Sequence, residues 1–150
     1  MPDGSSLADR LAALGYAEGG DAGDVAIAPE QVNRVVRENL DELDGGIIRY
    51  LKPHPPLAGL EGLTSGPGKV RRTMEALASG SVTVDELEEA YERTYRVAFE
   101  AMLDILPELD GRVAVTADHG ECLRCGQLFH ADRFDPHDHL VEVPWFEVER

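Results

Sequence analysis

Cysteine and long apolar runs are scarce in this sequence of 150 residues. Its two cysteines, Cys122 and Cys125, are too few for a disulfide framework. No apolar run approaches the length of a membrane-spanning helix. Residues 1–6 have neither a positive region nor an apolar stretch, so we expect no secretory signal. These absences predict a soluble, cytoplasmic chain.

Basic side chains are also scarce. The 14 lysines and arginines are outnumbered by 29 aspartates and glutamates, and the formal net charge is -15. Because the binding of phosphates needs a basic patch, this balance argues against nucleic acid and anionic membranes as partners. An acidic surface of this kind is typical of a halophilic cytoplasm, where salt screens the self-repulsion of the chain. The length and the 43% hydrophobic content fit one domain.

The spacing of apolar residues predicts helices alternating with short strands. Three helices are expected, over about residues 7–14, 29–43 and 84–106, the last with a Thr83/Glu86 capping box and Pro107 at its end. Two short buried strands are expected over Ile47–Leu51 and Val113–Val115. Residues 53–68 contain eight prolines and glycines in sixteen positions, which predicts an irregular loop.

This order of elements predicts an α/β fold. A helix that crosses between two strands implies that the strands are parallel. In open parallel sheets, ligands bind beyond the carboxyl ends of the strands. The loop after the first expected strand carries His54, and the loop after the second carries Asp118 and His119. If the strands are neighbours, these side chains face the same crevice.

The adjacent Asp118 and His119 offer an oxygen and a nitrogen ligand. This mixed set of oxygen and nitrogen ligands suits Zn²⁺ or Mn²⁺. Ca²⁺ prefers a site made of oxygen ligands alone. Gly120 permits a tight turn, and Glu121 is placed to orient His119. From the residues alone, an ordinary polar loop is the more frequent explanation of such a pair, and it stays open.

Longer segments carry a family resemblance. The segment Val113–Glu121 resembles the strand and metal-binding loop of sulfatases and phosphoethanolamine transferases, in the sulfatase branch of the alkaline phosphatase superfamily. The segment Arg49–Pro56 resembles the "PHxP" segment of that family. The sequence from His137 to Trp145 resembles the end of sulfatase-like proteins from salt-loving archaea, and residues 7–16 resemble the family's helix that ends in Gly-Tyr.

The resemblance implies a fold and a set of site residues. We expect a partial alkaline-phosphatase-like domain over residues 1–150, a parallel sheet with flanking helices that lacks the N-terminal part of the fold, with residues 1–28 partly flexible. Asp118 and His119 would bind a divalent metal (Zn, Mn or Ca), and His54 and His130 would contact the anionic group of a sulfuric or phosphoric ester.

The same resemblance raises doubt about activity. The family's nucleophile and first acidic metal ligands lie upstream of the Gly-Tyr helix, and no residue of this sequence corresponds to them. We therefore expect a sulfatase-like, metal-binding chain that is inactive alone. A second chain could complete the fold, or the chain could be a non-catalytic relic.

A small zinc-binding interaction module is the alternative. Cys122 and Cys125 have the spacing of a zinc knuckle, and His137 and His139 follow. Two thiolates and two imidazoles could close a tetrahedral zinc site. The other explanation of the same pattern is two buried or unreactive thiols that bind no metal.

Overall fold

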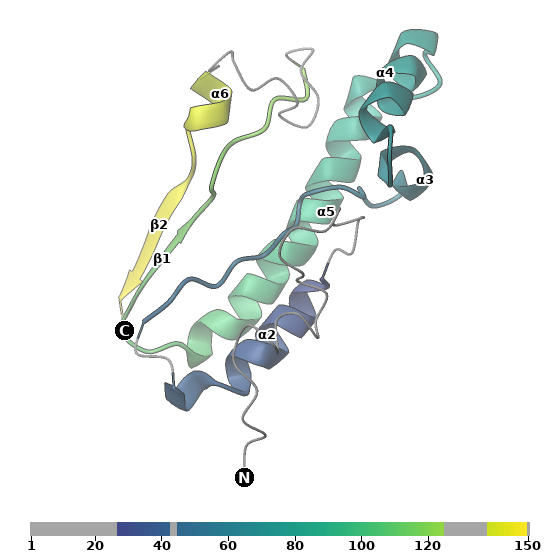
Figure 1. Ribbon diagram of the computed structural model, residues 1–150. Coiled ribbons are helices and arrows are strands. Elements are labelled where there is room, and N and C mark those ends of the chain that lie inside the picture. Colours follow the sequence, from purple (N-terminus) through teal and green to yellow (C-terminus); the bar gives the residue numbers. More distant parts are fainter. Residues whose placement is uncertain (1–26, 43–44, 125–137, 150) are drawn as a thin grey trace.

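The computed structural model describes residues 27–42, 45–124 and 138–149 (Figure 1). In chain order the elements are α2 (Pro29–Arg37), η1 (Leu40–Glu42), α3 (Glu61–Thr64), α4 (Lys69–Ser79), α5 (Val84–Ile105), η2 (Leu106–Glu108), β1 (Arg112–Thr116), α6 (Asp138–Val141) and β2 (Trp145–Glu149). Helices and strands are therefore mixed, which confirms an α/β chain in general terms. The helix expected over residues 7–14 lies outside the described residues.

The long helix α5 packs against α2 and carries part of the apolar core. Its N-terminus is closed by the predicted capping box, in which the Glu86 amide donates to Thr83 Oγ1 (3.2 Å) and the Thr83 amide donates to Glu86 Oε2 (2.8 Å). Its buried stripe recurs every three or four residues, as an amphipathic helix requires, and comprises Leu87, Ala90, Thr94, Ala98, Ala101 and Ile105. The regular helix ends two residues before Pro107, so both predicted ends are confirmed.

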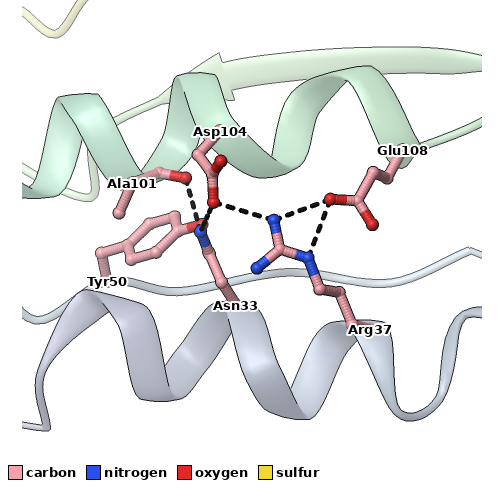
Figure 2. Close-up of polar contacts among 6 residues, drawn as sticks. All are labelled: Asn33, Arg37, Tyr50, Ala101, Asp104 and Glu108. Carbon is pink, nitrogen blue, oxygen red and sulfur yellow. Dashed lines mark hydrogen bonds and ion pairs between the residues drawn. The ribbon is translucent and has the colours of Figure 1, made fainter.

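Helix α2 packs against the C-terminal half of α5 (Figure 1). The buried Asn33 lies between them, and its Nδ2 donates to the Ala101 carbonyl of α5 (2.7 Å). Arg37, one turn further along α2, forms ion pairs with Asp104 (2.8 Å) and Glu108 (2.7 Å) (Figure 2). Small alanines on α5 allow the close approach that these contacts need.

The N-terminal half of α5 carries the main apolar core. Leu57, Leu87 and Ala90 are buried there, and partly buried residues pack on them: Leu60, Val70, Leu77, Tyr91 and Leu123. Helices α3 and α4 cover this part of α5 (Figure 1). Both fall where no helix was expected, so the prediction that residues 53–68 lack regular structure is wrong over Glu61–Thr64.

The only sheet in the described part of the chain has two strands. Strands β1 and β2 pair antiparallel, with Arg112 opposite Glu149 and Thr116 opposite Trp145. The expected strand at Val113–Val115 is confirmed, but it is not buried as predicted. The prediction of a strand over Ile47–Leu51 is wrong. That segment joins no ladder, and Ile47 is 96% exposed.

The predicted parallel pairing is therefore wrong as well, because one of its two strands does not form. No parallel pair of strands occurs within residues 27–42, 45–124 and 138–149. Among these same residues, no helix combines the length and apolar character that crossing a bilayer requires.

Candidate metal and anion site

The loop after β1 is held from both sides. Its Gly120 amide donates to the Leu140 carbonyl of α6 (2.9 Å), which joins the loop to the short helix before β2. Further along, Leu123 packs on the apolar core. Arg124 forms ion pairs with Asp85 (2.7 Å) and Glu88 at the start of α5. The candidate residues therefore lie in a segment with fixed ends rather than in an unsupported loop.

Within this loop, Asp118 and His119 direct their side chains toward each other. Asp118 Oδ1 lies 3.8 Å from His119 Nε2. The other ring nitrogen, Nδ1, lies 2.7 Å from the Gly120 carbonyl oxygen. Because a carbonyl oxygen only accepts, Nδ1 is the donor of this contact, which leaves Nε2 as the ring nitrogen that a metal can bind. A backbone carbonyl that fixes the tautomer is the usual second partner of a metal-binding histidine.

The geometry of the pair fits two positions of a metal site. With bond lengths of about 2.0–2.1 Å, two tetrahedral ligands of one Zn²⁺ lie about 3.4 Å apart. The observed 3.8 Å separation is close to that value. Within residues 27–42, 45–124 and 138–149, however, no group of three or more metal-binding side chains occurs. The pair supplies part of a coordination sphere, and further ligands have to come from water, from substrate or from elsewhere.

Arg49 contacts Asp118 of this pair, which the sequence analysis did not predict. Its Nη2 donates to Asp118 Oδ2 at 2.5 Å, across 69 positions of sequence. Both side chains are exposed, at 64% and 58%. One oxygen of Asp118 thus faces His119 while the other is held by a guanidinium. The signal that could have suggested this is the position of Arg49 five residues before His54, in the segment expected to border the same crevice.

The neighbouring residue holds Arg49 in place. Tyr50 donates its hydroxyl proton to Asn33 Oδ1 (2.5 Å), which anchors the segment to α2 (Figure 2). The segment runs as an extended trace (Figure 1), and successive side chains of an extended chain point to opposite sides. Tyr50 therefore points to the helices and Arg49 points to the loop of Asp118. Burial raises the pKa of Tyr50 to about 12, so this donor keeps its proton at neutral pH.

His54 lies on a turn that is tied to the helices. The turn is followed by the buried Leu57, whose amide donates to Thr64 Oγ1 (2.9 Å), and by Ala58, whose amide donates to Thr94 Oγ1 of α5 (2.8 Å). The His54 side chain is exposed, and its Nδ1 lies 3.3 Å from the Pro55 carbonyl oxygen. Lys52 Nζ donates to the Pro56 carbonyl (2.9 Å), so a cationic side chain lies on the same turn as His54.

The structure thus brings together Asp118, His119 and Arg49. His54 is placed by contacts within its own turn, and a crevice shared with Asp118 and His119 stays a prediction. The half-buried Glu121 lies near Tyr91, whose pKa is raised to about 12 by burial first and by the charge of Glu121 second. Its predicted role in orienting His119 also stays a prediction.

The residues of the zinc alternative are only partly described. Cys122 is disulfide-bonded, and a sulfur in that state offers no thiolate to zinc, so the alternative requires the reduced protein. Cys125, His130 and His137 lie outside the described residues, and only the backbone of His139 is described, within α6.

Comparisons with known proteins add no relative. No protein-family model, no curated protein and no solved structure matches this chain.

Proposed function

We propose that this chain is the metal-binding and oxyanion-binding part of a sulfatase-like hydrolase domain of the alkaline phosphatase superfamily. The observation that carries the proposal is the loop after β1. Its His119 ring is held with Nε2 toward Asp118 Oδ1 by a hydrogen bond from Nδ1 to the Gly120 carbonyl. The sequence resemblance from Val113 to Glu121 covers the same residues and adds the family.

In this proposal the residues have separate tasks. Asp118 and His119 bind a divalent cation, which when bound polarises an ester oxygen. His54, with His130 from outside the described residues, contacts the sulfate or phosphate group and stabilises charge that develops on it. No residue of this sequence corresponds to the family's nucleophile. We therefore propose that the chain does not hydrolyse esters alone.

The proposed partner is a second, different polypeptide that supplies the nucleophile and neighbouring strands of an alkaline-phosphatase-like sheet. A sheet of two strands is marginally stable in water by itself. On β2, Trp145 is 65% exposed and Phe146 is 58% exposed, so apolar surface is available to such a chain. A second copy of this chain is disfavoured at low salt because each carries a net charge of -15.

The test is metal binding by the purified chain in high salt. Bound Mn²⁺ and Zn²⁺ are measured for the wild type, for Asp118→Ala/His119→Ala and for Cys122→Ser/Cys125→Ser. Asp110→Ala, which removes an exposed aspartate just before β1, is the matched control. We expect the wild type, the control and the cysteine variant to bind metal. We expect the Asp118→Ala/His119→Ala variant to bind none.

Two other outcomes contradict the proposal. If metal is lost only in the cysteine variant, the chain is a zinc-binding interaction module. If none of the proteins binds metal, the Asp118–His119 pair is an ordinary polar loop. Hydrolysis of an aryl sulfate or aryl phosphate by the chain alone would contradict the proposed inactivity and would leave the metal site in place.

A further inference from the structure

The ion pair between Arg49 and Asp118 joins the two binding functions of the proposed site. Asp118 Oδ2 accepts from Arg49, and Asp118 Oδ1 faces His119 Nε2. The carboxylate that would bind a cation is therefore already neutralised by a guanidinium. A divalent cation and an oxyanion such as sulfate each need one partner of this pair. The cation takes the Asp118 carboxylate, and the oxyanion takes the Arg49 guanidinium.

We propose that Arg49 couples the binding of the cation to the binding of the oxyanion by exchanging Asp118 for the oxyanion. This inference rests on the proposed function, because it assumes that Asp118 and His119 bind a metal. A guanidinium has a planar fork that pairs with two oxygens of a sulfate or phosphate group. When an oxyanion occupies that fork, Asp118 becomes available to the metal. By thermodynamic linkage the reverse holds to the same extent, so bound metal strengthens the binding of the oxyanion.

The structure supports an exchange rather than a permanent bond. Both side chains are more than half exposed, and exposed ion pairs contribute little to stability, so the pair can open at low cost. The backbone beside Arg49 stays in place when the pair opens, because Tyr50 remains bonded to Asn33 on α2. The freed guanidinium therefore stays close to the loop that carries Asp118 and His119.

The size of the effect follows from Coulomb's law. A cation of charge +2 about 5 Å from a guanidinium in water is disfavoured by roughly tenfold in affinity, and salt reduces this factor. We therefore expect removal of Arg49 to strengthen metal binding by about fivefold at low salt. Couplings between two ligands are typically about fivefold or more, and we expect sulfate to strengthen metal binding in the wild type by about that factor.

The experiment measures Mn²⁺ affinity of the full chain from the electron paramagnetic resonance signal of free Mn²⁺. Each protein is titrated with and without inorganic sulfate, with chloride added to equalise ionic strength and a protein-free blank to correct for Mn²⁺–sulfate pairs. The proteins are the wild type, Arg49→Gln and Arg71→Gln. Arg71 forms an exposed ion pair with Glu75 within α4, so its removal changes the net charge equally without touching the loop.

We expect sulfate to strengthen Mn²⁺ binding in the wild type and in Arg71→Gln. Arg49→Gln is expected to bind Mn²⁺ more tightly than the wild type without sulfate and to respond to sulfate weakly or not at all. A sulfate response of equal size in Arg49→Gln and the wild type would overturn the coupling, and so would a wild type that binds Mn²⁺ without any response. Both of these results leave the proposed function standing. If none of the three proteins binds Mn²⁺, both the proposed function and the coupling are wrong.

Discussion

At the scale of single residues, Asn33 is a buried amide whose position depends on its hydrogen-bond partners. It is 1% exposed, and its amide makes three hydrogen bonds, to Tyr50, Ala101 and Asp104 (Figure 2). A buried amide without partners is costly, so each partner matters. Because the Tyr50 bond also fixes the segment that carries Arg49, this network links the packing of α2 on α5 to the geometry of the candidate site.

Replacement of Tyr50 by phenylalanine is expected to destabilise the fold by about 1–2 kcal/mol. The change removes only the hydroxyl and leaves Asn33 Oδ1 without its donor in a buried place. Urea unfolding at neutral pH measures the difference. Tyr95→Phe removes the hydroxyl of a tyrosine that is 44% exposed, and it is expected to change stability by less than about 0.5 kcal/mol. Equal effects of the two substitutions would contradict the role of the Tyr50 bond.

The same residue gives the unfolding free energy a pH dependence. Burial raises the pKa of Tyr50 from 10.0 to about 12 in the folded protein. A folded pKa above the unfolded one means that this contribution is complete below about pH 10 and is lost as the pH rises through about 12. Tyr50→Phe is therefore expected to lose less stability than the wild type between those two pH values. An unchanged loss would contradict the prediction. Tyr91, whose pKa is also raised to about 12, makes its own contribution to this loss of stability. Tyr91→Phe should therefore also lose less stability than the wild type over the same pH range.

At the scale of elements, the ends of α5 are set by local chemistry. Thr83 and Glu86 satisfy each other's backbone amides, and the Thr83 amide and hydroxyl hold the pKa of Glu86 below its usual range. Thr83→Ala removes the oxygen that accepts from the Glu86 amide, and a lost N-cap costs about 1 kcal/mol. Thr83→Ser keeps the oxygen and should retain most of that stability. Thermal unfolding followed by circular dichroism compares the three proteins. A serine variant as unstable as the alanine variant would assign the effect to packing of the threonine methyl group instead.

The predictions that held are those that depend on neighbours in sequence. The Thr83 cap and the stop near Pro107 are both readable within a few residues. Helix α4 was not predicted because Gly66 and Gly68 indicate a break in regular structure. In the structure Gly68 adopts a left-handed conformation (φ 75°) directly before the helix begins, so the glycine marks a start and not a loop.

The predictions that failed depend on which strand lies next to which. Ile47 and Ile48 look like part of a buried strand, but an apolar run does not specify its partner. In the structure β1 pairs with the distant β2, and Ile47 stays exposed. For the same reason the contact of Arg49 with Asp118, which spans 69 positions of sequence, was not predicted.

At the scale of the whole molecule, negative charge dominates. The net charge of -15 is distributed over a chain of 150 residues, while the ion pairs among the described residues join mostly exposed side chains and contribute little to stability. Self-repulsion of such a chain favours expanded states, and dissolved salt weakens it. The Debye length falls from about 10 Å at 0.1 M salt to about 3 Å at 1 M, which is shorter than most separations between surface charges. Stability should therefore rise with salt.

We expect the unfolding free energy to increase by at least about 1 kcal/mol between 0.1 M and 2 M KCl, which raises the melting temperature by roughly 2–4 °C. A general effect of salt on apolar burial would also stabilise the chain, so a variant has to separate the two causes. Glu38→Gln/Asp41→Asn/Glu42→Gln removes three exposed negative charges around η1 and leaves the apolar core unchanged. If repulsion is the cause, this variant is more stable than the wild type at low salt, and the difference closes at high salt. Equal salt dependence in both proteins would show that the acidic surface does not set the stability of this fold.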